Sequence, residues 1–315
     1  MKLAIRPCLV LAGLVAGVGA SAARLDAVDA DPLNEIVVEA RGPRFVVPTQ
    51  RDQIGRIWAP VYINGKGPFR LVLDTGASES GVTAELASIL GLDENVAAPV
   101  LLRGVTGSAK VRTVLVDTLS VGDLTQGAAI LPVIPDAMGG AQGILGTGAM
   151  LDRRVWIDFR HDQLVIAFSR GERAGRNFQT IPFRSLRDKL IVADALVGGI
   201  PTKAIIDTGG QATIGNLALR DRLARQSGYR RPSRPDQIID ATLEAQDGEI
   251  LDTPAIAFGR LQIRDPGVTY ADVHIFSYWH LMHEPAILIG MDALGLLDTL
   301  VIDYRRHELQ MRLLE

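Results

Sequence analysis

The chain has 315 residues, of which 47% are hydrophobic, so it is long and apolar enough to form one large domain or two lobes with separate cores. Its 33 basic and 36 acidic side chains leave a formal net charge of −3, and the sequence contains no basic stripe that could follow a phosphate backbone. Nucleic acid is therefore not an expected partner. The single cysteine, Cys8, lies near the start of the chain. If the N-terminal segment is removed, the remaining chain has no cysteine and can therefore form no disulfide and use no thiol nucleophile.

Residues 1–23 have the pattern of a secretory signal peptide. Lys2 and Arg6 precede an apolar run over 7–19, and small residues of the kind that a signal peptidase cleaves follow it. The run is close to the lower length limit of a spanning helix, so an uncleaved membrane anchor is the alternative. The sequence therefore predicts an exported protein, periplasmic or secreted, or one anchored by this helix. Residues 24–50 mix charges, prolines and short apolar pieces, and are predicted to form an N-terminal linker or an edge strand.

Two segments, 133 residues apart, have closely similar sequences. Leu71–Gly76 reads Leu-Val-Leu-Asp-Thr-Gly, and Ala204–Gly209 reads Ala-Ile-Ile-Asp-Thr-Gly. Before each copy, two apolar stretches flank a turn rich in glycine and proline, which is typical of a β-hairpin. Asp74 and Asp207 are therefore predicted to lie where a buried strand ends.

The repeat continues downstream of each aspartate. Apolar residues at helical spacing predict short helices over 84–90 and 217–225, with Gly91 and Gly228 as C-caps. Matched apolar segments predict further strands, over 119–124 with 256–261, 143–146 with 287–290, and 155–159 with 300–304. The sequence thus predicts a mostly β protein with short helices, divided into a first lobe over 51–170 and a second over 175–315.

A repeated acidic loop of this kind suggests acid–base chemistry. If the lobes face each other about a pseudo-twofold axis, Asp74 and Asp207 meet, and two close carboxylates share one proton because both cannot ionise easily. One could then activate a water as general base while the other polarises a peptide carbonyl as general acid. Four neighbouring residues are expected to orient the pair, the hydroxyls by bonding across the lobes and the glycine N–H groups by bonding the carboxylates: Thr75, Gly76, Thr208 and Gly209.

Both halves resemble the lobes of retropepsin-like and pepsin-like aspartic proteases in their Asp-Thr-Gly loops and in the later segments 143–146 and 287–290. The stretch 288–304 is similar in particular to bacterial retropepsin-like domains. The resemblance implies the acid protease fold, with two pseudo-symmetric closed β lobes around a peptide-binding cleft. It implies a monomeric endopeptidase with both lobes in one chain, a protein or peptide substrate, and no cofactor or metal. The sequence departs from the family at Gly210, where a residue with a side chain usually follows the glycine.

The family covers its cleft with a glycine-tipped hairpin, the flap. Residues 101–111 have apolar flanks and a glycine tip of this kind. The tip residues are candidates for substrate binding: Gly104, Val105, Thr106 and Gly107. In the second lobe, 238–250 has more polar flanks with 246–248 as its turn, and either a flap or a plain hairpin is possible there.

Two other functions remain to be compared with the protease. His280 and His283, with Glu284, superficially resemble a metal site, but the order does not match the zinc protease motif. Because 274, 276, 278 and 280 alternate, these residues are predicted to lie on one face of a strand and to serve packing or the surface. The stronger alternative is a catalytically silent, protease-like module that binds peptides. Membrane association is expected only if the N-terminal segment stays uncleaved.

Overall fold

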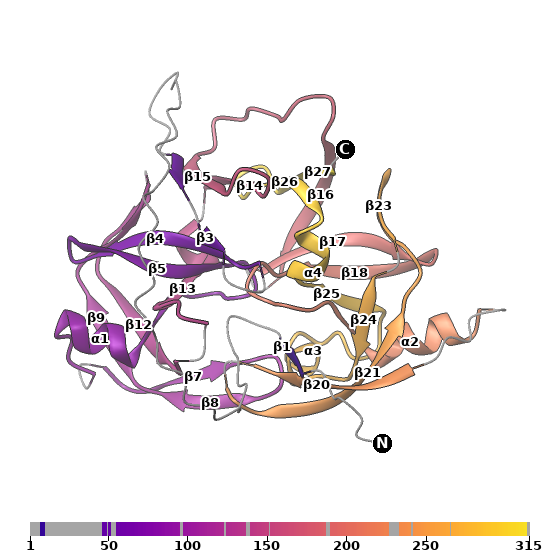
Figure 1. The fold of residues 1–315 in the computed structure, drawn as a ribbon, viewed down its shortest axis with the longest axis horizontal. Helices are drawn as coiled ribbons and strands as arrows, with labels where there is room; N and C mark the ends of the chain where they lie inside the picture. The colour runs from indigo at the N-terminus through magenta and orange to yellow at the C-terminus, as the bar shows by residue number, and fades with distance from the viewer. Residues whose placement is uncertain are drawn as a thin grey trace, which may run out of the picture.

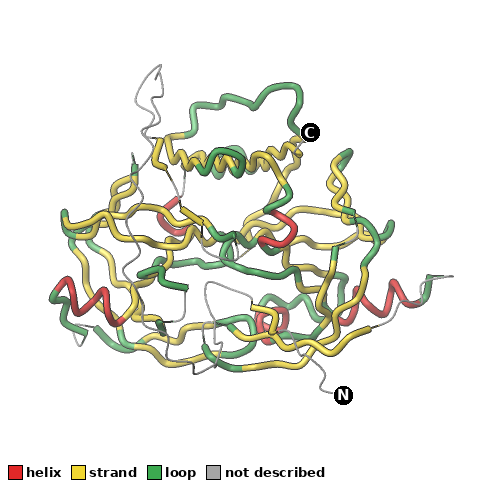
Figure 2. Tube along the Cα trace, viewed as in Figure 1, coloured by secondary structure: helices red, strands yellow, loops and turns green. Residues whose placement is uncertain are grey.

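The computed structural model describes most of the chain from residue 55 onward and three short strands before it (Figure 1). The described residues are 7–9, 46–48, 50–51, 55–94, 97–122, 124–136, 139–150, 152–186, 190–226, 233–240, 242–264 and 266–313. The predicted signal peptide and linker lie mostly outside them. Strands predominate and the helices are short, which confirms a mostly β protein (Figure 2).

The first half is built on the predicted hairpin of β4 (Ile57–Ile63) and β5 (Lys66–Asp74). Side chains of β4 alternate between buried and more exposed, as in a strand with one face on the core, whereas the last four residues of β5 are all buried. β13 (Gly143–Gly146) lies parallel to β5 on its other side, with Gly146 opposite Asp74. Being paired on both sides, β5 carries Asp74 into the interior.

The second half repeats this arrangement. β17 (Leu190–Val197) and β18 (Ile200–Ile206) form the hairpin, and β25 (Ala286–Ile289) lies parallel to β18. Both halves then continue in the same order, through β6 (Gly81–Thr83) and β12 (Ala129–Ile134) in the first and β19 (Ile214–Gly215) and β24 (Gly267–Tyr270) in the second. The sequence repeat is therefore also a repeat of strand pairing.

A shared layer connects the halves, above them in Figure 1. Its antiparallel strands are β2 (Val46–Pro48), β15 (Gln163–Phe168), β14 (Arg153–Asp158), β26 (Leu297–Asp303), β27 (Glu308–Leu313) and β16 (Gln179–Leu186). One end of β16 pairs with β27 and its other end with β17, so this layer runs into the sheet of the second half. The described strands close no barrel for this reason, and the prediction of two closed β lobes is not confirmed.

The remaining strands are short or form hairpins. They are β1 (Pro7–Leu9), β3 (Gln50–Arg51), β7 (Val100–Arg103), β8 (Ser108–Val111), β9 (Thr113–Val116), β10 (Leu119–Val121), β11 (Leu124–Gln126), β20 (Ser233–Ile239), β21 (Ala245–Asp252), β22 (Ile256–Phe258) and β23 (Leu261–Ile263). The predicted strand–turn–strand units over 119–124 and 256–261 are confirmed.

The helices are α1 (Ala84–Leu90), α2 (Leu217–Ala224), α3 (His274–Tyr278), α4 (Met291–Leu294) and the 3-10 helix η1 (Thr147–Met150). The predicted cap of α1 is correct, since Gly91 is left-handed at φ 69°. α2 ends earlier than predicted, at a right-handed Arg225, and Gly228 lies outside the described residues. Within the described part of the chain, none of these helices has the length and apolar character needed to cross a membrane.

Candidate active site

The two aspartates occupy equivalent buried positions. Asp74 is the last residue of β5 and Asp207 directly follows β18, and neither side chain is accessible to solvent. The Oδ1 atom of each accepts two backbone N–H groups, from Gly76 (2.8 Å) and Ala77 (2.9 Å) at Asp74, and from Gly209 (2.9 Å) and Gly210 (3.0 Å) at Asp207. The expected bonds from the glycine N–H groups are thus present, and Gly210 donates as Ala77 does.

Two threonines hold the acidic loops together. Thr75 Oγ1 donates to the carbonyl oxygen of Ile206 (2.7 Å), and Thr208 Oγ1 donates to that of Leu73 (2.7 Å). Each hydroxyl also accepts the other threonine's backbone N–H, at 3.1 and 3.0 Å. These four hydrogen bonds are buried and nearly symmetric. They place the ends of β5 and β18 face to face, as the sequence predicts.

Each loop glycine lies against the carboxylate of the opposite half. A Cβ atom on Gly76 would lie 2.7 Å from the Cγ atom of Asp207, and one on Gly209 would overlap the carboxylate of Asp74. Glycine is therefore required at both positions by space. The Oδ2 atoms of both aspartates are buried, and no other described residue donates a hydrogen bond to them. If one of the two carboxyl groups is protonated, its O–H can donate a hydrogen bond to the other aspartate.

The electrostatics of the pair differ between the two aspartates. Burial raises the pKa of Asp74 well above its ordinary value, and the charge of Asp207 raises it further against the opposing effect of the backbone N–H groups. Burial also raises the pKa of Asp207, and the net value is about 6 because the N–H groups of Gly209 and Gly210, the hydrogen bond with Asp74 and the guanidinium of Arg56 oppose the effect of burial. Both shifts favour a pair that retains a proton at higher pH than two ordinary aspartates would.

Arg56 marks a difference between the halves. In the antiparallel β4–β5 ladder Trp58 pairs with Val72. The same register, extended by two residues to the end of β5, sets Arg56 opposite Asp74. In the β17–β18 ladder Val192 is opposite Ile205, which places Leu190 opposite Asp207 in the same way. Both side chains are buried, at 1% and 3% exposed. One half therefore contributes a cation at the position where the other contributes an alkyl group.

The predicted flap of the first half is a hairpin of β7 and β8 (Figure 1). Its tip is closed by a hydrogen bond from the N–H of Gly104 to the carbonyl of Gly107 (2.8 Å). Thr106 bonds to the second half, through its N–H to Asp240 Oδ2 (2.7 Å) and through its hydroxyl to the carbonyl of Glu244 (2.8 Å). The flap tip is thus tied to the turn between β20 and β21.

The prediction for the hairpin of the second half was wrong about its turn. Residues 246–248 lie within β21, and the chain turns between the end of β20 and the start of β21, where Asp240 accepts the N–H and hydroxyl of Thr242. Asp240 was missed as a site residue. The repeat could have indicated it, because Asp240 lies 134 residues after Thr106, close to the offset of the two aspartates.

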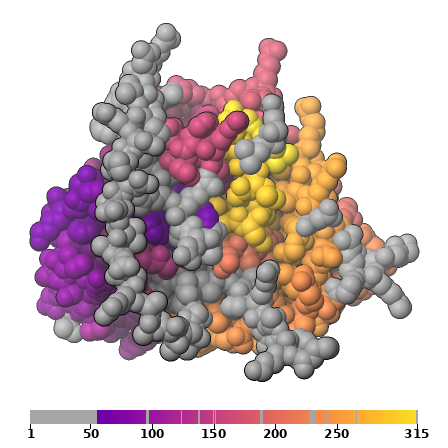
Figure 3. Space-filling view, viewed as in Figure 1, coloured from indigo at the N-terminus to yellow at the C-terminus, as the bar shows by residue number. Residues whose placement is uncertain are grey.

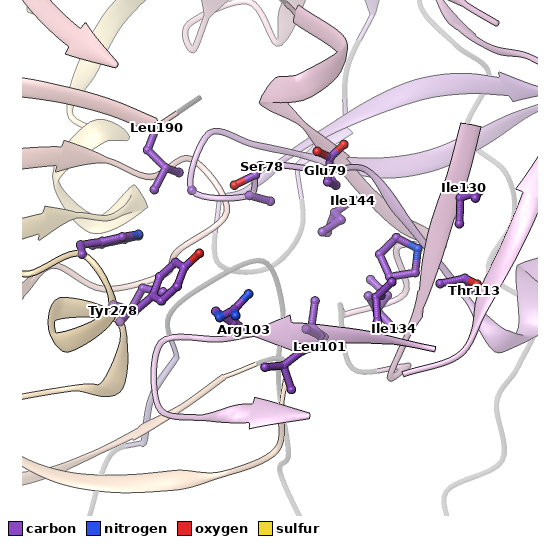
Figure 4. A pocket seen from close by; sticks show the side chains of 17 residues that line it. Ser78, Glu79, Leu101, Arg103, Thr113, Ile130, Ile134, Ile144, Leu190 and Tyr278 are labelled. Atoms are coloured by element: carbon purple, nitrogen blue, oxygen red, sulfur yellow. The ribbon is translucent and has the colours of Figure 1, made fainter. Parts of the chain in front are cut away.

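A cavity of about 300 Å³ opens between the loop after Asp74 and the strand β7 (Figure 4). Its walls are mainly apolar, and they include Ile134 and Ile144 of the first half and Leu190 of the second. Tyr278 and Trp279, from α3 and its C-cap, complete the wall. The cavity therefore adjoins the candidate catalytic pair and receives side chains from both halves.

The prediction that 274, 276, 278 and 280 share one face of a strand is wrong. Residues His274–Tyr278 form α3, and Ile275, Phe276 and Trp279 are buried at the spacing of a helix rather than of a strand. His274 contacts Ser108 of the flap, at 3.0 Å between Nε2 and Oγ. Among the residues that the structure describes, no three His, Cys, Asp or Glu side chains gather closely enough to hold a metal ion.

Comparison with known proteins agrees with this geometry. Residues 59–149, which contain Asp74, match the family model described as aspartyl protease. No curated protein matches the chain. The match supports an aspartic protease family and a protease function in general. It covers the first half, so Asp207 lies outside it.

Proposed function

We propose that this protein is an aspartic endopeptidase, with lobes over 51–170 and 175–315 and a catalytic pair formed by Asp74 and Asp207. The observation that carries the proposal is the pair of buried Asp-Thr-Gly loops, bonded to each other through their threonines. The two-lobed, pseudo-symmetric arrangement is supported by the repeated order of strands in the two halves, which lie on opposite sides of the molecule in Figure 3.

The pair would hydrolyse a peptide bond with a single shared proton. The ionised carboxylate takes a proton from a water molecule, whose oxygen bonds to the peptide carbonyl carbon while the protonated partner donates to the carbonyl oxygen. Collapse of this tetrahedral species breaks the C–N bond as the newly protonated carboxyl gives its proton to the leaving nitrogen, while the partner carboxylate takes back a hydroxyl proton and the carbonyl re-forms. Because Arg56 stabilises the charged form of Asp207, Asp207 is the base and Asp74 the acid in the first step.

The flap tip and the threonines have supporting roles in this proposal. Gly104–Gly107 would cover a bound peptide, since the tip reaches the opposite hairpin at Asp240. Thr75 and Thr208 hold the carboxylates in register, and Gly76 and Gly209 leave the space in which they meet. We also propose export to the periplasm or outside the cell, from the signal-peptide pattern of residues 1–23.

The rival function is a silent module that binds peptides without cutting them. A binder would gain nothing from two carboxylates buried against each other, because burial disfavours their charge and their repulsion adds to that cost. The presence of the complete pair favours the enzyme.

A mass-spectrometric cleavage profile of the purified protein on a peptide library tests the proposal. We expect internal peptide bonds to be cut, with no loss of rate in EDTA or after treatment with serine- or thiol-directed reagents. Asp207→Asn should be inactive, while Asp117→Asn, at an exposed position away from the pair, should behave as wild type. Cleavage by Asp207→Asn at the wild-type rate, or rate loss in EDTA that zinc restores, would refute the proposal.

A further inference from the structure

The loop that follows Asp207 lies against the start of α4. The N–H of Met291 donates to the carbonyl oxygen of Gly210 (2.8 Å). The next N–H along the chain, that of Asp292, donates to the carbonyl oxygen of Gln211 (3.0 Å). The catalytic carboxylate stands at the beginning of this loop, so its position depends on how firmly α4 holds the residues after it.

The side chain of Asp292 fastens the far end of the same loop. Its Oδ1 atom accepts the hydroxyl of Thr213 (2.7 Å), and its Oδ2 atom accepts the N–H of that residue (3.0 Å). The Thr213 hydroxyl in turn accepts the N–H of Gly290 (3.2 Å). Thr213 is fully buried, whereas Asp292 is exposed, so removing its carboxylate breaks these bonds without opening a cavity in the core.

The first half has no carboxylate at the equivalent position. There the N–H of Gly146 donates to the hydroxyl of Ser80 (3.1 Å), which is the counterpart of the bond to Thr213. Two residues after that glycine the chain has Gly148, which occupies the position of Asp292 and has no side chain. The carboxylate clamp is therefore an addition to the second half.

The second loop is also the one with more backbone freedom. Gly209 and Gly210 are adjacent in it, whereas in the first loop Gly76 is followed by Ala77. A glycine has a wider range of backbone conformations than an alanine and loses more entropy when it is fixed. The additional freedom and the additional clamp thus occur in the same loop.

We propose that Asp292 is a positioning residue for Asp207. Its carboxylate holds the loop 209–213 against α4 and offsets the freedom of the two adjacent glycines. The N–H groups of Gly209 and Gly210, which bond the catalytic carboxylate, are kept in place by this clamp. Asp292 acts through the loop and not on the substrate, and the inference rests on the proposed peptidase function.

The first test measures kcat and KM separately. Asp292→Ala should lower kcat about tenfold and change KM less than about twofold, because the acid–base geometry is disturbed while the cleft is not. Asp292→Asn keeps one acceptor oxygen and should recover kcat to within about threefold of wild type. Asp221→Ala is the matched control, since this aspartate lies in α2 and pairs with the adjacent Arg220, and it should leave both constants unchanged.

A second substitution distinguishes positioning from a general loss of stability. Ala77 makes the same N–H bond in the first loop that Gly210 makes in the second, so an alanine is compatible with this geometry. Gly210→Ala, added to Asp292→Ala, should raise kcat at least about threefold because it restricts the loop again. If Asp292 only stabilised the fold, its loss would lower the temperature of thermal unfolding, and Gly210→Ala would not restore kcat.

Hydrogen exchange followed by mass spectrometry tests the clamp without using activity. Asp292→Ala should speed exchange over 209–213 at least about fivefold and leave 76–80 as in wild type. Unchanged exchange over 209–213, or a wild-type kcat in Asp292→Ala, would overturn the inference and leave the peptidase in place. Absence of any cleavage by wild type would instead refute the proposed function. In that case faster exchange confined to 209–213 still supports the clamp, and unchanged exchange overturns it.

Discussion

The two halves of the molecule agree where the chemistry needs a pair and differ where a substrate would lie. Around Asp74 and Asp207, strand order, backbone N–H donors and threonine bonds are nearly the same on both sides. A few residues away the halves differ. The first half has Arg56 at the position where the second has Leu190, and among the described residues α3 occurs only in the second half. The comparison suggests that two carboxylates must match in position to share a proton, while peptides are asymmetric and need unequal walls.

The largest expected effect is the loss of either carboxylate. Asp74→Asn and Asp207→Asn should each lower kcat by at least about 10³-fold, because a lone carboxylate cannot fill both roles. The two losses should be similar, and the folds should remain intact by circular dichroism. If one variant keeps appreciable turnover, the halves are not equivalent partners and the paired mechanism fails.

The next effect tests the contact of each glycine with the opposite carboxylate. Gly76→Ala and Gly209→Ala should each reduce kcat/KM by about 10- to 100-fold, because the new methyl group pushes the opposite carboxylate out of place. Gly127→Ala is the control, since a Cβ atom there meets nothing within 4 Å. Steady-state kinetics on one peptide measure all three variants. Full activity of Gly76→Ala would show that the loops are further apart than described.

A smaller effect concerns stability. Thr75→Val and Thr208→Val each remove a hydroxyl that donates one hydrogen bond and accepts another across the halves. Each should lower the free energy of unfolding by about 2 to 5 kcal/mol, since two buried backbone groups lose their partners. Denaturant titration provides the value. The two substitutions should cost nearly the same, and a large difference between them would contradict the symmetry of the junction.

The smallest effect is a shift in the pH dependence. We expect a bell-shaped profile of kcat/KM, with the acidic limb reporting protonation of the base. The Arg56 guanidinium lowers the pKa of Asp207, so removing it in Arg56→Leu raises that pKa and moves the acidic limb to higher pH, by about one unit. Arg56→Lys should retain most of the wild-type position. An unshifted limb in Arg56→Leu would show that this cation does not select the base.

Much of the central fold could be predicted from the sequence because the repeat supplied two copies of one local pattern. The hairpins leading to Asp74 and Asp207 follow from apolar stretches on either side of a turn, and the short helix after each aspartate follows from apolar residues at helical spacing. The open sheet could not be predicted, because it arises where one end of β16 pairs with β27 and the other end with β17. No local sequence pattern indicates that a strand pairs with two different partners along its length.

Long-range contacts also limited how much of the candidate site could be predicted from the sequence. The prediction for residues 274–280 took every second residue as one face of a strand, whereas the apolar residues come in pairs three residues apart, which suits the observed helix and its packing against the flap of the other half. Asp240 was missed for a related reason, since its role depends on the N–H of Thr106 in the opposite half. The role of Arg56 likewise depends on Asp207, which lies far from it in the chain.

Turnover by mixed inactive proteins tests the central claim, that both aspartates act within one chain, most directly. Asp74→Asn and Asp207→Asn proteins are combined in equal amounts, and the hydrolysis of one peptide is followed over a wide range of protein concentration beside wild type. We predict that the mixture stays inactive at every concentration and that wild-type activity per chain does not fall on dilution. Recovery of activity in the mixture would show that the two loops pair between chains and would contradict the single-chain site.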